Sequence, residues 1–340
     1  MKITKKTIKC YKSYDQQLEL LKKRGMVISD EEWAIKKLKQ VGYYRLSGFW
    51  YRYRCPITFH LQQSPQYLIL NPIRFPSIPK RKNIFTPNTT IEKINSLYLF
   101  DCELKILLFE GIARIENFMR SVIAHTIGEI DPLGYKNRSL IDTFYLNTNN
   151  ESKSKYDQWL DKLNNSIENS KDDCIRWHKE NYQDIPIWAV TEIWDFGMLS
   201  KFYGMLKDTY KLGICQAIFN DKRLANSHKK NMKGALQHLN IIRNKCAHHA
   251  RIWNISINSP KFNLKLVDEL KIINPKDVSW EKIFGTICLM WMLIRLFSTN
   301  SEWLKKIINH IDRLPILVDD VNYSEMGFTY AHLDNLKKLI

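Results

Sequence analysis

The sequence predicts an all-α fold. Apolar residues recur at the helical i, i+3, i+4 spacing over most of the chain, and glycine is sparse, with 12 in 340 residues. The sequence has no alternation of strand and helix patterns and no glycine-rich phosphate loop. Hydrophobic residues make up 44% of the chain, which is enough for a large core and excludes an intrinsically disordered protein.

Composition divides the chain into three parts. Residues 1–54 are predicted to be a basic helical region, because residues 1–60 hold 14 Lys and Arg against 5 Asp and Glu. Residues 55–90 contain six of the eleven prolines, and proline blocks helix interiors and central strands. This part is therefore predicted to be a loop-rich insertion with room for a short hairpin. Residues 91–340 are predicted to form the main helical domain with its C-terminal helices.

The N-terminal region reads as two helices between residues 14 and 54, with Gly25 suited to the end of the first. Ser29 followed by Glu32 fits a capping box at the start of the second. One long helix is predicted from Thr90 to about residue 128. Further helices are predicted within 146–182, at 186–206, at 228–253, near 277–297 and 301–311, and near 330–340. Core tryptophans are predicted at Trp188, Trp194, Trp253 and Trp291.

The charge balance points to a polyanionic partner. The chain carries a net charge of +17, which favours RNA, DNA or an anionic membrane surface. Its N-terminus lacks the apolar core of a signal peptide, and its most apolar run, 283–297, is shorter than the roughly 20 residues that span a bilayer. Seven cysteines without a CxxC pair are typical of reduced thiols. We therefore expect a cytoplasmic protein that does not use a membrane.

The run IIRNKCAHHARIW, residues 241–253, gathers Arg243, His248, His249 and Arg251. Three interpretations compete: a solvated basic helix face, a metal site, or an acid–base site acting on phosphate. A metal would prefer histidines at i, i+4, whereas adjacent histidines point apart. No metal and no cofactor is therefore expected, and the first and third interpretations stay open.

Helical geometry places Arg243 inside an apolar stripe of the helix predicted at 228–253, where a charge needs a partner. That stripe consists of Met232, Ala235, Leu236, Leu239, Ile242, Cys246, Ala250 and Trp253. Glu116 on the long helix is our choice of partner, although Glu116 can instead pair with Arg120 at i, i+4. His248 lies about 140° from Arg243 on an ideal helix, while Asn244 and His248 share a face. This geometry indicates a cleft shared between two helices or two subunits.

These residue types suffice for RNA cleavage without a metal. Imidazole exchanges protons near neutral pH, so His248 is the candidate general acid and base. Arg243 can stabilise the phosphate as its charge develops, and Asn244 can orient His248 or bind an oxygen. The reaction would be attack by a 2′-hydroxyl on the adjacent phosphate, which DNA cannot undergo. His249 and Arg251 are secondary candidates, with a plain surface role as the alternative for each.

The motif RNKCAHH resembles the R-N-x-x-x-H pattern of HEPN-superfamily ribonucleases, with Arg243, Asn244 and His248 in the motif positions. Four further segments resemble the Abi family of bacterial abortive-infection proteins of the AbiD/AbiF type, and the first three stand in the family's order with the RNKCAHHARIWN helix after them. They are YDQQLELLKKRGMVISDEEWAIKKLKQVGYYRLSGFWYRYR, SLYLFDCELKILLFEGIARIENFMRSVIAHTIG, PIWAVTEIWDFGMLSKFYGML and MGFTYAHLDNLKKL.

The resemblance implies a HEPN-like helical bundle with metal-independent endoribonuclease activity and cyclic-phosphate products. It implies a site shared across a homodimer, and a role in phage defence or as the toxin of a toxin–antitoxin system. It also implies a cognate small non-coding RNA that binds and restrains the enzyme. The alternative is a non-catalytic RNA-binding protein that uses the same basic surface.

The segment GYYRLSGFWYRYR, residues 42–54, is a second candidate surface. Aromatic faces can stack on unpaired bases and arginine can bind phosphate. The predicted RNA-binding residues are Tyr43, Tyr44, Arg45, Arg52 and Arg54. The competing interpretation is that the aromatic side chains of this segment dock the N-terminal helices onto the bundle.

Overall fold

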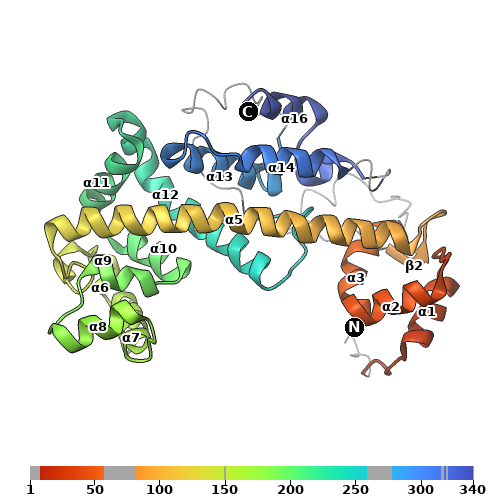
Figure 1. Cartoon of the computed structure of the whole chain (residues 1–340), viewed down its shortest axis with the longest axis horizontal. Coiled ribbons are helices and arrows are strands. Elements are labelled where there is room, and N and C mark those ends of the chain that lie inside the picture. The colour runs from red at the N-terminus through yellow and green to blue at the C-terminus, as the bar shows by residue number, and fades with distance from the viewer. Residues whose placement is uncertain are drawn as a thin grey trace, which may run out of the picture. The chain divides into compact units, whose positions relative to one another are not determined.

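The computed structural model describes residues 8–56, 81–148, 151–258, 278–314, 318 and 321–339. These residues form fourteen α-helices, several short 3-10 turns and one two-stranded sheet, so the predicted all-α fold class is confirmed (Figure 1). The chain separates into two compact units. Unit 1 comprises residues 1–102 and 313–320, and unit 2 comprises residues 103–312 and 321–340.

The first two helices of unit 1 are fixed by their N-caps. Helix α1 (Tyr14–Lys23) starts with a capping box, in which Ser13 and Gln16 exchange side-chain and backbone hydrogen bonds. Helix α2 (Glu31–Val41) is capped by Asp30, whose carboxylate accepts the Trp33 N–H at 2.9 Å. The capping box predicted at Ser29 was therefore wrong, and the Ser29 hydroxyl instead donates to Glu92 at 2.7 Å.

The second predicted helix is divided at Gly42. Its φ of 90° is favourable only for glycine, so α2 stops there and α3 (Tyr43–Trp50) begins in a new direction. A 3-10 turn then leads into strand β1 (Arg54–Pro56), which pairs antiparallel with β2 (Arg81–Phe85). These strands lie at the two ends of the Pro-rich part, and residues 57–80 lie outside the described residues.

Aromatic packing holds α3 in unit 1. Trp50 is fully buried and makes edge-to-face contacts with Tyr43 at 4.9 Å and Phe85 at 6.2 Å between ring centroids. Phe49 makes an edge-to-face contact with Tyr98, with 5.5 Å between the ring centroids. Tyr44 differs, because 70% of its surface stays exposed. Docking therefore accounts for most aromatic residues of this segment and leaves Tyr44 facing solvent.

Helix α5 (Ile91–Ile130) runs for 40 residues, about 60 Å at 1.5 Å per residue. Within unit 2, α13 (Ile283–Phe297) and α14 (Trp303–Asp312) lie along it (Figure 1). Phe118 stacks on Phe297 at 4.5 Å, and the Trp303 indole N–H donates to the Leu107 carbonyl at 2.8 Å. Helix α13 is buried from its first residue to Ile294, as its composition predicted.

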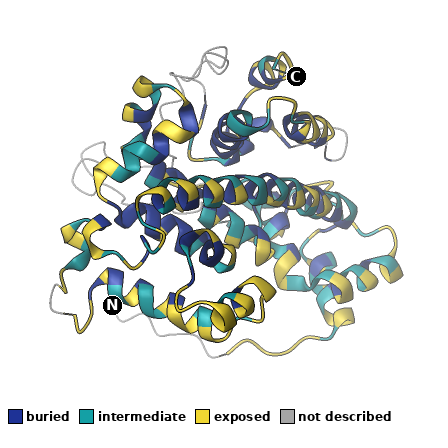
Figure 2. Ribbon diagram, turned by 60° about the vertical axis from the view of Figure 1, so that its left-hand side comes forward, coloured by how far each residue is buried: buried dark blue, intermediate teal, exposed yellow. Residues whose placement is uncertain are grey.

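The remaining helices of unit 2 are shorter than predicted. The stretch 146–182 was predicted to contain one helix but holds two, and 186–206 breaks where Asp195 caps a new helix. The helix before α12 was not predicted at all. The bounds are α6 (Thr143–Leu146), α7 (Lys155–Glu168), α8 (Asp173–Asn181), α9 (Ile187–Val190), α10 (Phe196–Met205), α11 (Asp208–Phe219), α12 (Lys222–Ala247) and α16 (Tyr330–Lys337). Buried residues line the faces where these helices meet (Figure 2).

Two contacts fix α12 inside unit 2. Helix α10 approaches it closely at Gly204, where a Cβ would come within 3.1 Å of the Lys233 side chain. On the side of α13, the ring of His238 is 2.8 Å from the Thr286 hydroxyl through Nε2. Burial lowers the pKa of His238, which favours the neutral ring in this position. Helix α12 is thus held between α10 and α13.

Gly111 and Gly234 allow a matched test of this packing. A Cβ at Gly111 on α5 would lie 2.6 Å from the Trp303 indole nitrogen, whereas a Cβ at Gly234 on α12 would meet nothing within 4 Å. We expect Gly111→Ala to lower the free energy of unfolding by roughly 1–3 kcal/mol through overpacking. Gly234→Ala should raise it by about 0.5–1 kcal/mol through helix propensity. Urea unfolding followed by circular dichroism measures both, and equal stability of the two variants would contradict this account.

Candidate functional site

Helix α12 carries most of the predicted site residues. Asp221 caps its start by accepting the N–H groups of Arg223 and Leu224 at 2.7 and 3.0 Å. The predicted apolar stripe is buried on the helix at Met232, Ala235, Leu236, Leu239, Ile242 and Cys246. The helix begins at Lys222 and ends at Ala247, so the bounds predicted for it, 228–253, were wrong at both ends.

The two histidines form the C-terminal cap of α12. His248 is the C-cap residue, and His249 adopts a left-handed conformation with φ of 54°. The His249 N–H donates to the Cys246 carbonyl at 3.0 Å, and the Ala250 N–H donates to the Lys245 carbonyl at 2.9 Å. This pair of bonds is a Schellman motif, which usually places glycine where His249 stands. The helix therefore does not continue through the histidines to Trp253.

Arg243 is half-buried and has few partners. Its Nη1 donates to the Asn244 side-chain oxygen at 3.3 Å, and its guanidinium lies 5.8 Å from the centre of the Phe109 ring on α5. The Nε of Arg243 is shielded from solvent and has no hydrogen-bond partner among the residues that the structure describes. Among the described residues, no carboxylate oxygen lies within 4.0 Å of this guanidinium.

Glu116, the predicted partner of Arg243, is paired with another residue. Glu116 is buried on α5 and accepts from Arg120 Nη2 at 2.5 Å, so the alternative Glu116–Arg120 pair is the one that forms. The same Nη2 donates to the Trp194 carbonyl at 2.6 Å. Burial raises the pKa of Glu116 above its ordinary value, against the opposing fields of Arg120 and Arg243. Arg243 thus acts on Glu116 through its field and without a direct ion pair.

Asp195, the N-cap of α10, is a further acidic group near Arg243. Burial by itself would raise its pKa, but the hydrogen bonds from Lys162 and the Met198 N–H, with the field of Arg243, hold the pKa of Asp195 below its ordinary value. The carboxylate is therefore charged at neutral pH. Sequence reasoning assigned no site role to Asp195, since its distance in sequence hides its proximity to α12.

The structure brings the predicted residues together only in part. Arg243 and Asn244 are in contact, and Asn244 and His248 are both exposed at the end of α12. The His248 ring makes no side-chain hydrogen bond among the described residues, and Arg251 follows the cap in the connecting segment. Phe109 and Glu116 on α5 and Asp195 at the start of α10 complete the surroundings of Arg243.

A family model described as Abi-like protein matches residues 36–254, well over half of the chain. The chain belongs to this family. The match includes α5, α10 and α12, and therefore Glu116, Asp195, Arg243 and His248. It leaves out residues 14–35 and the C-terminal segment MGFTYAHLDNLKKL. Comparisons with curated proteins and with solved structures gave no match.

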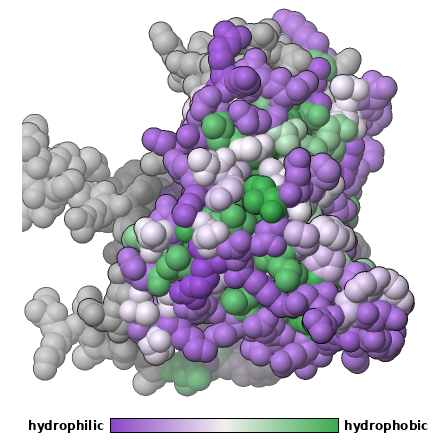
Figure 3. Space-filling model, turned by 90° about the vertical axis from the view of Figure 1, so that its left-hand side faces the viewer, coloured by the Kyte–Doolittle hydropathy of each residue, from purple (hydrophilic) through white to green (hydrophobic). Residues whose placement is uncertain are grey.

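Membership of the Abi-like family supports a role in abortive infection, a form of phage defence. Within the part of this Abi-like chain that the structure describes, no helix has both the length and the apolar character required to cross a bilayer. The end of unit 2 that carries α8, α9 and α11 faces the viewer in Figure 3, and its apolar groups are separated by hydrophilic residues.

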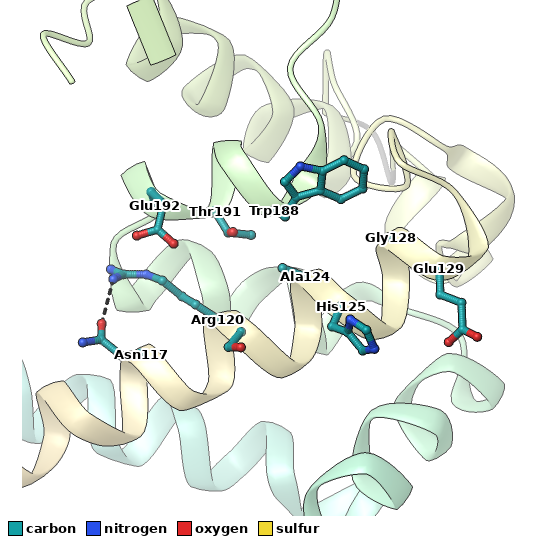
Figure 4. Close-up of a pocket in the computed structure, with 10 residues that line it drawn as sticks. Asn117, Arg120, Ala124, His125, Gly128, Glu129, Trp188, Thr191 and Glu192 are labelled. Carbon is teal, nitrogen blue, oxygen red and sulfur yellow. Dashed lines mark hydrogen bonds between the residues drawn. The ribbon is translucent and has the colours of Figure 1, made fainter. Parts of the chain in front are cut away.

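A cavity of about 780 Å³ adjoins the Glu116–Arg120 pair in this Abi-like protein (Figure 4). Arg120 lies at one end of it, hydrogen-bonded to Asn117 at 3.1 Å, while Glu129 and Glu192 supply carboxylates. Trp188 forms a wall and is 52% exposed, so the prediction that it is a core residue was wrong. With Arg120 already paired and two carboxylates present, this cavity disfavours a phosphate.

The left-handed backbone conformation of His249 offers a test that separates the effect of backbone strain from the effect of the imidazole ring. We expect His249→Gly to raise the free energy of unfolding by about 1 kcal/mol, because a left-handed conformation costs an L-residue roughly 1–2 kcal/mol. His249→Ala should lose the ring without this gain. Thermal unfolding of both variants measures the difference, and a His249→Gly protein less stable than His249→Ala would refute the assignment of backbone strain.

The five predicted RNA-binding residues lie in unit 1. Tyr43 accepts a hydrogen bond from Arg24 at 2.7 Å, and Tyr44 and Arg45 are exposed. Arg54 donates to Asn83 at 3.2 Å and lies over the Tyr51 ring. All except Arg52, which lies over the Tyr53 ring, line a groove of about 1100 Å³ between α1, the end of α2 and the start of α3. We call it the N-terminal groove.

Proposed function

We propose that this Abi-like protein is a metal-independent HEPN endoribonuclease that acts in phage defence. The observation that carries the proposal is the state of Arg243. Its guanidinium is half-buried and its Nε has no hydrogen-bond partner among the described residues. Glu116 and Asp195, the acidic groups on which its field acts, are held by Arg120 and Lys162. A cation in this state stabilises an anion placed beside it, and a phosphate suits the planar guanidinium.

The proposed reaction uses the exposed end of α12. His248 takes the proton from a 2′-hydroxyl, the O2′–P bond forms and the P–O5′ bond breaks. The proton that left O2′ is returned to O5′ by imidazolium. Arg243 stabilises the negative charge on the phosphate oxygens, and Asn244 orients His248 or binds one of these oxygens. His249 and Arg251 contact flanking phosphates, and the products carry a 2′,3′-cyclic phosphate and a 5′-hydroxyl.

A homodimer is part of this proposal. Arg243 and His248 lie on different faces at the end of α12, so a second copy of the helix supplies the complementary group more readily than the same helix does. The net charge of +17 supports RNA as substrate and a small non-coding RNA as the partner that restrains the enzyme.

Product chemistry tests the proposal. The purified protein is incubated with a labelled RNA in the presence of a metal chelator, and the fragment ends are identified by mass spectrometry. Cyclic-phosphate ends, together with protection by a single 2′-deoxy substitution at the cleaved position, are the expected results. Fragments with 3′-hydroxyl ends, or cleavage of the deoxy-substituted strand, would refute the mechanism.

A non-catalytic RNA-binding protein is the second candidate, and the N-terminal groove is the observation that favours it. On this alternative Arg243 and His248 hold RNA without cleaving it. Intact RNA would then be recovered from the assay above at every chelator concentration, although binding would persist.

A further inference from the structure

We infer that the N-terminal groove binds an unpaired segment of RNA, and that it does so independently of the residues that cleave. The inference rests on the proposed function for the identity of the ligand as RNA. The groove belongs entirely to unit 1, and its walls include eight residues between Lys9 and Arg24, a part of the chain that the family model does not match.

The charge of the groove is of one sign. Six cationic side chains line it, and no Asp or Glu occurs among the described residues of its lining. The six are Lys9, Lys12, Arg24, Lys39, Arg45 and Arg54. Arg45 and Arg54 are among the predicted RNA-binding residues, and the other four come from α1, its approach and α2. A groove lined by charge of one sign attracts a polyanion and follows its backbone.

Aromatic rings hold several of these cations in place of carboxylates. Lys9 Nζ lies 5.6 Å from the centre of the Tyr44 ring, and Lys39 Nζ lies 5.8 Å from that of Tyr14. Arg24 donates to the Tyr43 hydroxyl. A ring face orients a cation without neutralising its charge, so these groups keep their full attraction for phosphate.

Arg54 carries an unused donor at the groove. Its Nη1 donates to Asn83 at 3.2 Å, and its Nε has no hydrogen-bond partner among the described residues. Arginine carries five N–H donors, so the Arg54 guanidinium keeps donors for a ligand in the groove that it lines. A phosphate oxygen is the acceptor that matches a guanidinium.

The tyrosine rings of the groove favour single-stranded RNA over duplex RNA. The groove wall also includes Tyr11, Tyr14, Tyr43 and Tyr44, of which Tyr11 and Tyr44 are 87% and 70% exposed. Bases of a duplex are stacked on one another and cannot reach a protein ring, whereas unpaired bases can. At about 1100 Å³ the groove exceeds the roughly 300–1,000 Å³ of ordinary small-molecule sites, which suits several nucleotides.

The test compares two triple variants of the full chain that remove equal charge. The groove variant is Lys9→Gln, Lys12→Gln and Lys39→Gln. The control variant is Lys23→Gln, Lys36→Gln and Lys82→Gln, which are exposed in the same unit and outside the groove lining. Tyr44→Ala and Tyr44→Phe test stacking. Fluorescence anisotropy with a labelled single-stranded RNA and with its duplex measures binding across a salt series.

We expect the groove variant to bind the single strand at least ten-fold more weakly than the control. The slope of log K against log salt should fall by about 2, near 0.7 for each lost phosphate contact. Tyr44→Ala should weaken binding about ten-fold while Tyr44→Phe does not. Equal loss in groove and control variants, or equal affinity for duplex, would overturn the inference. Cleavage is scored separately, so a wild type that binds through the groove without cutting RNA would refute only the proposed function.

Discussion

Replacing His248 with alanine should lower the rate of RNA cleavage by about 10²–10⁴-fold, the usual contribution of a positioned general acid or base. RNA binding should persist, since His248 is exposed at the end of α12 and its ring supports no hydrogen bond among the described residues. Single-turnover cleavage with a chelator present measures the rate, and anisotropy measures binding.

The matched control is His125→Ala, because His125 is another exposed histidine near a helix end, on α5. It should cleave at the wild-type rate. If both variants kept full activity, His248 would have no catalytic role, and this result would contradict the proposed mechanism. If both lost it equally, the loss would reflect folding, which circular dichroism of the two proteins would reveal.

Arg243→Ala should reduce cleavage by about 10²–10³-fold, as removal of one group that stabilises transition-state charge usually does. Arg243→Lys should recover only a fraction, because ammonium lacks the planar pair of donors. Loss of stability should be small, since Arg243 forms no ion pair within 4.0 Å among the described residues. The control is Arg223→Ala on the first turn of the same helix, where the side chain is 95% exposed.

Mixing two inactive proteins tests the shared site directly. If Arg243 of one copy works with His248 of the other, unfolding and refolding Arg243→Ala together with His248→Ala yields dimers that contain one intact site. Random pairing should then restore about one quarter of the wild-type rate. A mixture as inactive as its components would exclude a site shared in this way.

The sequence predicted those parts of the fold that periodicity controls. The buried stripes of α5 and α12 and the burial of α13 follow directly from the apolar spacing. The errors lie where one residue overrides the pattern. Gly42 divides a helix through its positive φ, and Asp195 starts a new helix by capping it. His249 ends α12 in a backbone conformation that is usual for glycine. The sequence has no glycine at this position, so the residue pattern did not predict the end of the helix there.

The candidate site was predictable in its residues but not in its pairings. A charge inside an apolar stripe marked Arg243 as unusual, and the family motif added Asn244 and His248. Glu116 pairs with Arg120, and Asp195 at the start of α10 lies near Arg243. These arrangements depend on how helices far apart in sequence pack together. Helical geometry along a single segment contains no information on such contacts. The same reason explains why the sequence did not show that the cations of the N-terminal groove come together.

The hydrogen bond between His238 and Thr286 bears on the moment during synthesis at which the proposed RNA cleavage can begin. Helix α12 rests against α13, which is synthesised well after the motif at residues 243–248. A nascent chain therefore carries the reactive side chains without the support that fixes them. On the proposed function, the ribosome that synthesises the chain is itself largely RNA and would be exposed to cleavage. On the proposed chemistry, placing this support late in the chain delays activity until translation is nearly complete.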